Sequence, residues 1–92
     1  MEFEWDPEKA AGNLAKHGVG FIEASSIFAD PFELTLADPG HSGDEFRFIS
    51  LGTSSGGRLL VVSYTERGTR IRIISAREAT PRERRQYESE KA

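Results

Sequence analysis

The sequence predicts an α+β domain in which an antiparallel β-sheet packs against helices. Three observations support this. Two apolar runs, residues 59–64 and 71–74, flank the loop 66–68, which is typical of a β-hairpin. Two helical patterns precede this hairpin, and a third follows it. The expected element order is β-α-α-β-β-β-β-α, with two N-terminal helices on one side of the sheet and a polar helix at the C-terminus.

The first strand is expected at residues 3–5, and a helix begins directly after it. Asp6 is a suitable N-cap, and Pro7 suits the first helical position because no backbone N–H is needed there. The helix is expected to run to His17 and to end at Gly18, which can adopt the left-handed conformation.

The spacing of apolar side chains indicates which side of this helix is buried. We expect Ala10, Ala11 and Leu14 to face the core because they lie close together on one helical face. Trp5 or Phe3 is then expected to pack over the first turn.

A second short helix is predicted over residues 20–29. Its evidence is a set of residues at helical spacing, namely Phe21, Ala24, Ser25 and Phe28. Asp30 and Pro31 end it, since the residue before proline avoids the helical region. The following elements are a strand at 32–37, a polar turn at 38–44, a strand at 45–51 and a flexible loop at 52–57. In the central hairpin, Gly68 is expected to occupy the third place of a three-residue loop with a bulge.

The last helix, from residue 81 to about 89, begins with a capping box formed by Thr80 and Glu83. Tyr87 is its only sizeable apolar side chain, so burial of apolar side chains stabilises this helix only weakly. This helix therefore either lies on the surface through Ala79 and Tyr87 or is covered by another chain.

Composition narrows the class of protein. The chain has 92 residues, enough for one domain, with 37% hydrophobic and 29% charged residues. It has no cysteine, which excludes disulfides and cysteine-based zinc sites. No apolar run approaches the ~20 residues of a membrane span, and residues 1–10 do not resemble a signal peptide. We therefore expect a cytoplasmic protein without a membrane partner.

The charge is distributed unevenly along the chain. Residues 1–57 hold three basic and ten acidic side chains, a balance of −7, whereas residues 58–92 hold nine and five, a balance of +4. The total of −3 and the lack of a helix-turn-helix pattern argue against direct DNA binding. The C-terminal third can still hold an anion locally.

Several stretches also carry a family pattern. They are FEWDPEKAAGNLAKHGVGF at 3–21, Ala-x-x-x-Phe-x-Asp-Pro at 24–31, His41-Ser42, GRLLVV at 57–62 and IRIISAR at 71–77. Together they resemble the BrnT family of bacterial toxins. The resemblance implies a RelE-like fold, a ribonuclease activity that inhibits translation, and neutralisation by a BrnA-type antitoxin. It also implies that DNA is contacted only through the antitoxin, in a higher-order complex. We expect no cofactor.

Cleavage of RNA by its own 2′-hydroxyl needs a base, cations at the phosphorane and an acid for the leaving oxygen, and it leaves a 2′,3′-cyclic phosphate. Arg70 and Arg72, two apart on one strand, share a sheet face, and Arg77 follows near the strand end. Alternatively, these are surface arginines paired with Glu45 or Glu66. The candidate catalytic residues of a metal-independent endoribonuclease are Lys16, His17, Arg72 and Arg77, and the candidate substrate-binding residues are Arg58, Arg70 and Tyr87.

Several of these assignments have a simpler structural alternative. Lys16 and His17 also suit the C-terminus of a helix, where cations stabilise the dipole by ~0.3–1 kcal/mol. As functional groups, His17 would transfer a proton and Lys16 would assist electrostatically, or the reverse. Tyr87 could stack on a base or simply dock the last helix.

His41 lies in a polar turn with Asp38, Ser42 and Asp44. A metal site or a Ser-His-Asp triad is conceivable there, but turn composition commonly produces such a cluster, and no metal is expected.

Two functional hypotheses follow from the sequence. The first is a ribonuclease toxin of a type II toxin–antitoxin module, acting on RNA. The second is a catalytically silent binding module that pairs with its partner, or acts as its co-repressor, through the last helix and a sheet edge. In either case we expect the antitoxin to cover the arginine-bearing face of the sheet, which offsets its charge.

Overall fold

The computed structural model describes the backbone of residues 1–42 and 46–91 and the side chains of residues 1–36 and 46–91. The elements are β1 (Glu2–Glu4), α1 (Pro7–His17), α2 (Phe21–Ser25), the 3-10 helix η1 (Ser26–Ala29), β2 (Leu34–Ser42), β3 (Phe46–Thr53), β4 (Leu59–Arg67), β5 (Arg70–Glu78) and α3 (Pro81–Lys91). The α+β class and the predicted element order are confirmed, with η1 continuing α2. No helix in the described part of the chain is long and apolar enough to cross a membrane.

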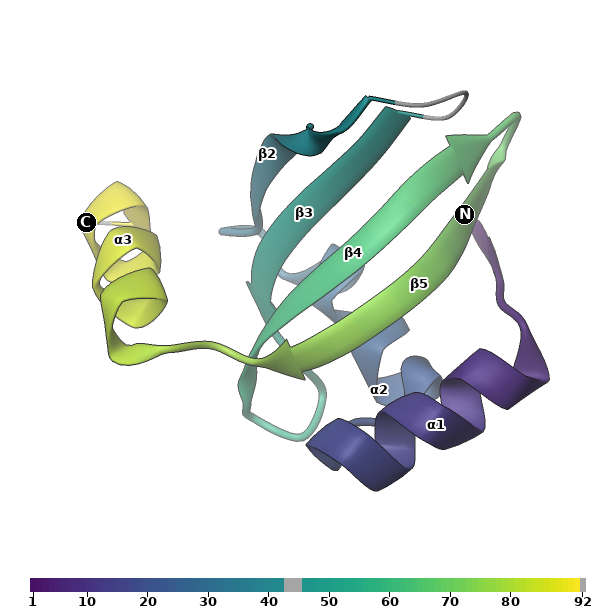
Figure 1. Cartoon of the computed structure of the whole chain (residues 1–92). Coiled ribbons are helices and arrows are strands. Elements are labelled where there is room, and N and C mark those ends of the chain that lie inside the picture. The colour runs from purple at the N-terminus through teal and green to yellow at the C-terminus, as the bar shows by residue number, and fades with distance from the viewer. Residues whose placement is uncertain (43–45, 92) are drawn as a thin grey trace.

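The five strands form one sheet in the order β1-β5-β4-β3-β2 (Figure 1). Strands β2 to β5 pair antiparallel, as predicted. β1 instead pairs parallel to β5, so the sheet is mixed rather than purely antiparallel. Parallel pairing is possible here because the two strands are joined by a long stretch of chain, which includes α1 and α2, and not by a tight turn.

The two faces of the sheet bury different clusters. Alternation along β4 sends Leu60, Val62 and Tyr64 toward α1 and α2, and Leu59 and Val61 to the opposite face. On the opposite face, Tyr87 of α3 packs with Leu51, Leu59 and Val61. The two N-terminal helices therefore lie on one side of the sheet, as expected, and α3 packs on the other side.

The buried face of α1 differs from the predicted one. Leu14 is 55% exposed and Ala11 is exposed, whereas Asn13 is only 8% exposed. The Asn13 amide donates to the carbonyls of Val19 (2.9 Å) and Ala76 (2.8 Å), and its Oδ1 accepts from the Ala76 N–H (3.0 Å). β1 pairs only with residues 70–72, so Ala76 lies beyond the paired part of β5 and Asn13 takes the place of a neighbouring strand.

The helix caps follow the sequence closely. Asp6 Oδ1 accepts from the Glu8 N–H at 2.8 Å, and Gly18 has φ of 69° at the end of α1. The capping box of α3 is also confirmed: the Thr80 N–H donates to Glu83 Oε1 at 2.8 Å, and the Glu83 N–H donates to Thr80 Oγ1 at 3.2 Å. Caps are local interactions, which explains why they could be predicted.

The loops differ from the prediction in three places. Arg67 pairs directly with Arg70, so the hairpin loop has two residues, and Gly68 with φ of 61° takes its first position, as in a type II′ turn. β2 extends to Ser42, into the predicted polar turn. The loop at 52–57 is held by hydrogen bonds, because the Ser55 N–H donates to Ser26 Oγ at 2.8 Å and Ser54 Oγ donates to Glu23.

Candidate active site

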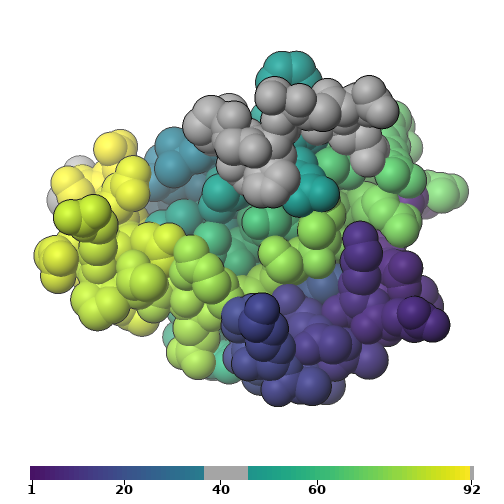
Figure 2. All heavy atoms as spheres, viewed as in Figure 1, coloured from purple at the N-terminus to yellow at the C-terminus, as the bar shows by residue number. Residues whose placement is uncertain are grey.

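The sheet face opposite α1 and α2 carries a group of cationic and hydroxyl side chains. We call it the arginine face, and it consists of Arg47 on β3, Ser63, Thr65 and Arg67 on β4, and Arg70, Arg72, Ser75 and Arg77 on β5. In Figure 1 this face is turned toward the viewer, with α2 behind the sheet. Figure 2 shows α3 and α1 flanking it. Cross-strand pairing thus gathers these residues on one surface, as predicted for Arg70 and Arg72.

Arg77 is held at the end of β5 by α3. Its Nη1 and Nη2 donate to the two carboxylate oxygens of Glu83, at 2.8 and 2.9 Å, and Nη1 also donates to the Glu78 carbonyl at 3.2 Å. The Arg77 side chain remains 41% exposed. The ion pair therefore fixes the guanidinium in place and leaves it accessible from solvent.

The same contact sets the ionisation of Glu83. The hydrogen bond from Arg77, supported by the Thr80 backbone, lowers the pKa of Glu83 from 4.5 to about 2. A carboxyl group whose pKa is depressed by folding stabilises the protein above its unfolded-state pKa, and this stabilisation is lost as the pH falls toward the folded-state value.

We therefore expect the stabilisation by Glu83 to disappear between about pH 4.5 and pH 2. Glu83→Gln should be less stable than the wild type near neutral pH, because glutamine lacks the charge that Arg77 pairs with. The difference in free energy of unfolding, measured with urea, should shrink toward zero as the pH falls through this range. A difference that stays constant with pH would contradict the role of this ion pair.

Arg70 and Arg72 pair with carboxylates of β1. Arg72 Nη1 donates to Glu4 Oε2 at 2.9 Å, and Arg70 lies 3.5 Å from Glu4 and 3.4 Å from Glu2. The hydrogen bond from Arg72 lowers the pKa of Glu4. The parallel register places Glu2 opposite Arg70 and Glu4 opposite Arg72. From the sequence, Glu45 and Glu66 had been considered as the partners of these arginines. The observed partners, Glu2 and Glu4, lie 68 residues before Arg70 and Arg72 in the chain.

Arg47 and Thr65 lie at the end of the arginine face that is farther from Arg77. Thr65 is 2% exposed, and its Oγ1 has no hydrogen-bond partner among the residues that the structure describes. A buried hydroxyl without a partner costs ~1–3 kcal/mol. Arg47 lies directly opposite Thr65 on β3, and no ion pair joins it to another residue within the described ranges.

Lys16 and His17 lie in the last turn of α1. Lys16 is exposed and His17 is half-buried. Asn13, one turn earlier, binds the backbone of Ala76, so this end of α1 lies beside the end of β5 that carries Arg77. No hydrogen bond joins the Lys16 or His17 side chain to the arginine face in the described parts of the chain.

Arg58 is not part of the arginine face. Its Nε donates to Glu23 Oε2 at 3.0 Å, its Nη2 donates to Glu23 and to the Gly18 carbonyl (3.1 Å), and its Nη1 lies 3.5 Å from Glu78. These contacts tie β4 to the connection between α1 and α2. The structure thus favours a structural role for Arg58 over substrate binding.

Tyr87 serves to dock α3. The side chain is 5% exposed, and its hydroxyl donates to Asp30 Oδ2 and lies 3.2 Å from Thr53 Oγ1. An RNA base cannot stack on a ring buried in this way, so the structure favours the docking alternative.

The side chains of His41, Asp38, Ser42 and Asp44 lie outside the described residues; among the described residues, no three acidic or histidine side chains are close enough to hold a metal ion.

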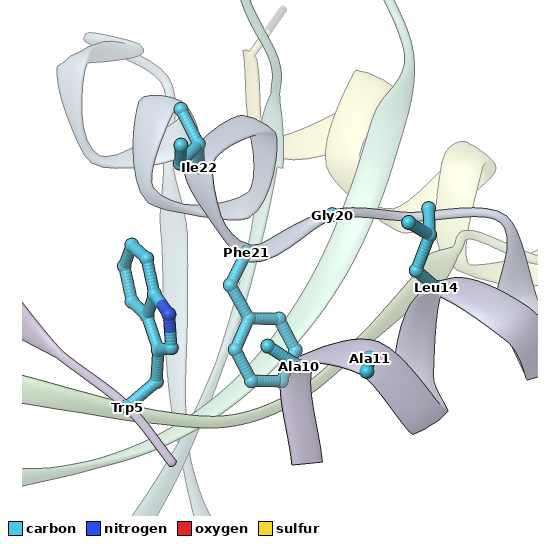
Figure 3. A pocket seen from close by; sticks show the side chains of 7 residues that line it. All are labelled: Trp5, Ala10, Ala11, Leu14, Gly20, Phe21 and Ile22. Carbon is cyan, nitrogen blue, oxygen red and sulfur yellow. The ribbon is translucent and has the colours of Figure 1, made fainter. Parts of the chain in front are cut away.

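A shallow pocket of about 270 Å³ lies between α1 and α2 (Figure 3). It is lined by Trp5, Ala10, Ala11, Leu14, Gly20, Phe21 and Ile22. Such an apolar lining offers no group for binding phosphate.

Comparison with known proteins decides the family. A family model described as the ribonuclease toxin BrnT of type II toxin–antitoxin systems matches residues 5–83. The chain belongs to the BrnT family. It is a ribonuclease toxin of a type II toxin–antitoxin system, as the sequence motifs implied. Membership also gives it an antitoxin as partner.

A solved structure supports the fold of this BrnT family member. The crystal structure of the ribonuclease toxin BrnT of Brucella abortus aligns with a TM-score of 0.64 over 87% of this chain and 97% of that one, at 24% sequence identity. A search of curated proteins gave no match.

Two BrnT residues of interest, Arg47 and Thr65, were missed in the sequence interpretation. Part of a signal was present, because Arg47 and Ile49 alternate along β3 with Phe48. The pairing of Thr65 with Arg72 depends on the two-residue hairpin loop, which was not predicted. Only the register between β3 and β4 shows that Arg47 lies opposite Thr65, in line with Arg72.

Proposed function

We propose that this BrnT toxin cleaves RNA without a metal ion, by attack of a 2′-hydroxyl on the adjacent phosphodiester. The 2′-oxygen bonds to phosphorus, the bond from phosphorus to the 5′-oxygen breaks, and a 2′,3′-cyclic phosphate and a 5′-hydroxyl result. The observation that supports this most is the placement of Arg77 and Arg72, two permanent cations, on one open sheet face. Arg77 would stabilise the charge that develops on the phosphorane, and Arg72, ~13 Å away along the sheet, would bind the RNA backbone beside it.

Arg77 is suited to this role because part of its guanidinium remains available. An arginine has five N–H donors, and Glu83 and the Glu78 carbonyl take three of those of Arg77. The remaining donors, Nε–H and one Nη2–H, form the second edge of the planar group. This edge can donate two parallel hydrogen bonds to a phosphate while Glu83 holds the first edge.

Proton transfer is assigned to the end of α1. In this proposal, His17 takes the 2′-hydroxyl proton or donates one to the leaving 5′-oxygen, and Lys16 assists electrostatically, or the two exchange roles. The support is the hydrogen bonding of Asn13 to Ala76, which brings the last turn of α1 beside the strand end that carries Arg77.

The chemistry of the products tests this mechanism. Purified toxin with RNA in excess EDTA should give fragments that end in 2′,3′-cyclic phosphate, identified by mass spectrometry. An RNA with a 2′-deoxy sugar on the 5′ side of the cleaved bond should stay intact, because the attacking hydroxyl is missing. Cleavage that EDTA abolishes and added Mg²⁺ restores would contradict the proposal.

We also propose that the antitoxin is of the BrnA type, covers the arginine face and provides the contacts to DNA. The support is electrostatic: Arg47, Arg72 and Arg77 share this face, whereas the whole chain carries a net charge of −3, which disfavours DNA binding by the toxin alone. The silent-module alternative relied on an unpartnered last helix, and Tyr87 docks that helix on the toxin itself.

A further inference from the structure

We propose that Arg47 and Thr65, together with Arg72, form a second phosphate-binding position on the arginine face. It would hold a phosphodiester of the bound RNA strand other than the one that is cleaved. This inference rests on the proposed function only in taking RNA as the ligand; it does not depend on how the RNA is cleaved.

The strand register brings the three side chains together. Thr65 on β4 lies directly opposite Arg47 on β3 and directly opposite Arg72 on β5. Directly opposed residues point to the same face, and neighbouring strands are ~4.8 Å apart, so the Cα atoms of the two arginines are separated by ~10 Å. Two long side chains at this separation can both reach an anion placed over the central threonine.

The hydrogen bonding of this position is incomplete. Thr65 Oγ1 is buried and has no partner in the described residues, and Arg47 has no carboxylate partner there. The other arginines of the face do have such partners: Arg67, Arg70 and Arg72 pair with Glu4, and Arg77 pairs with Glu83. An anion with several oxygens could accept from the hydroxyl and from both guanidinium groups at once, which a phosphodiester provides.

This position is distinct from the one at Arg77. Arg77 lies opposite Val61, four residues along β4 from Thr65, which corresponds to ~13 Å along the strand. Ser63 and Ser75, an opposed pair of half-buried hydroxyls, lie between the two positions. An RNA strand that follows β4 and β5 would therefore place different phosphates at Arg77 and at Thr65.

The test uses binding of an RNA that cannot be cleaved, a single-stranded oligonucleotide with 2′-O-methyl groups throughout, followed by fluorescence anisotropy with the full-length toxin. Arg47→Ala should weaken binding about 10-fold and reduce the salt dependence by about one released ion. Lys9→Ala removes the same charge from an exposed position on α1 and should leave both quantities unchanged. With cleavable RNA, Arg47→Ala should raise KM and leave kcat nearly unchanged.

Thr65→Val provides a second readout. Valine keeps the shape and removes the unpaired hydroxyl, so the variant should be at least as stable as the wild type and should bind RNA several-fold more weakly. A purely structural threonine would instead lose stability without affecting RNA binding.

Three results would overturn this inference: no RNA binding by the wild type, an Arg47→Ala affinity equal to that of Lys9→Ala, or a fall in kcat with KM unchanged. A fourth is that Arg47→Ala weakens binding of the purified antitoxin but not of RNA, which would make the position a protein contact. Failure of the metal-free mechanism has a different signature, since EDTA then blocks cleavage while the binding results still hold.

Discussion

Arg77→Ala is expected to lower the rate of RNA cleavage by about 10²–10³-fold while the protein stays folded, because in the proposed mechanism this cation stabilises the transition state. The single-turnover rate constant at saturating RNA measures this loss directly. Arg77→Lys should recover only a small part of the activity, since lysine keeps the charge and lacks the two-pronged geometry that binds phosphate and Glu83 at the same time.

Two variants separate this effect from a loss of stability. Glu83→Gln breaks the same ion pair but keeps the guanidinium, so it should lose similar stability and far less activity than Arg77→Ala. Arg85→Ala removes one positive charge from α3 at an exposed position two residues from Glu83, on another side of the helix, and should cleave RNA like the wild type. Undiminished cleavage by Arg77→Ala would show that this residue is not catalytic.

Asn13→Ala is expected to destabilise the fold by on the order of 3 kcal/mol. The variant leaves the N–H and carbonyl of Ala76 and the carbonyl of Val19 without their partner in a buried place. Urea unfolding followed by circular dichroism gives the free energy of unfolding. Activity should also fall, because this contact positions the end of α1 beside β5.

Leu14→Ala is the matched comparison on the same helix. Leu14 is 55% exposed, so its truncation should cost below about 1 kcal/mol, although the apolar pattern of the helix had suggested a core position. A larger loss for Leu14→Ala than for Asn13→Ala would mean that the pattern, rather than the structure, identifies the buried face.

Local features of the fold were predictable from the sequence. Asp6, Gly18 and the Thr80–Glu83 capping box each act within a few residues, and each is found as predicted. The position of the central hairpin followed from its apolar runs, but its loop is one residue shorter than predicted, because Gly68 can take φ > 0 in more than one turn type.

The candidate site was predictable only in part. Alternation along β5 placed Arg70 and Arg72 on one face without any tertiary information. Their carboxylate partners on β1 and the neighbouring Arg47 could not be predicted in this way. These contacts depend on which strands become neighbours and in what register, and residue spacing within one strand does not encode that.

By itself, the sequence determined the family, the class and order of the elements, and the ends of the helices, because these depend on motifs and on interactions over a few residues. Tertiary structure alone decided that Asn13 is buried in place of Leu14, that Arg58 binds Glu23 and Tyr87 binds Asp30, and that Arg47, Thr65 and Arg72 form one row. The physical reason is that a buried polar group must find a partner wherever the fold provides one, and that partner can lie anywhere along the chain.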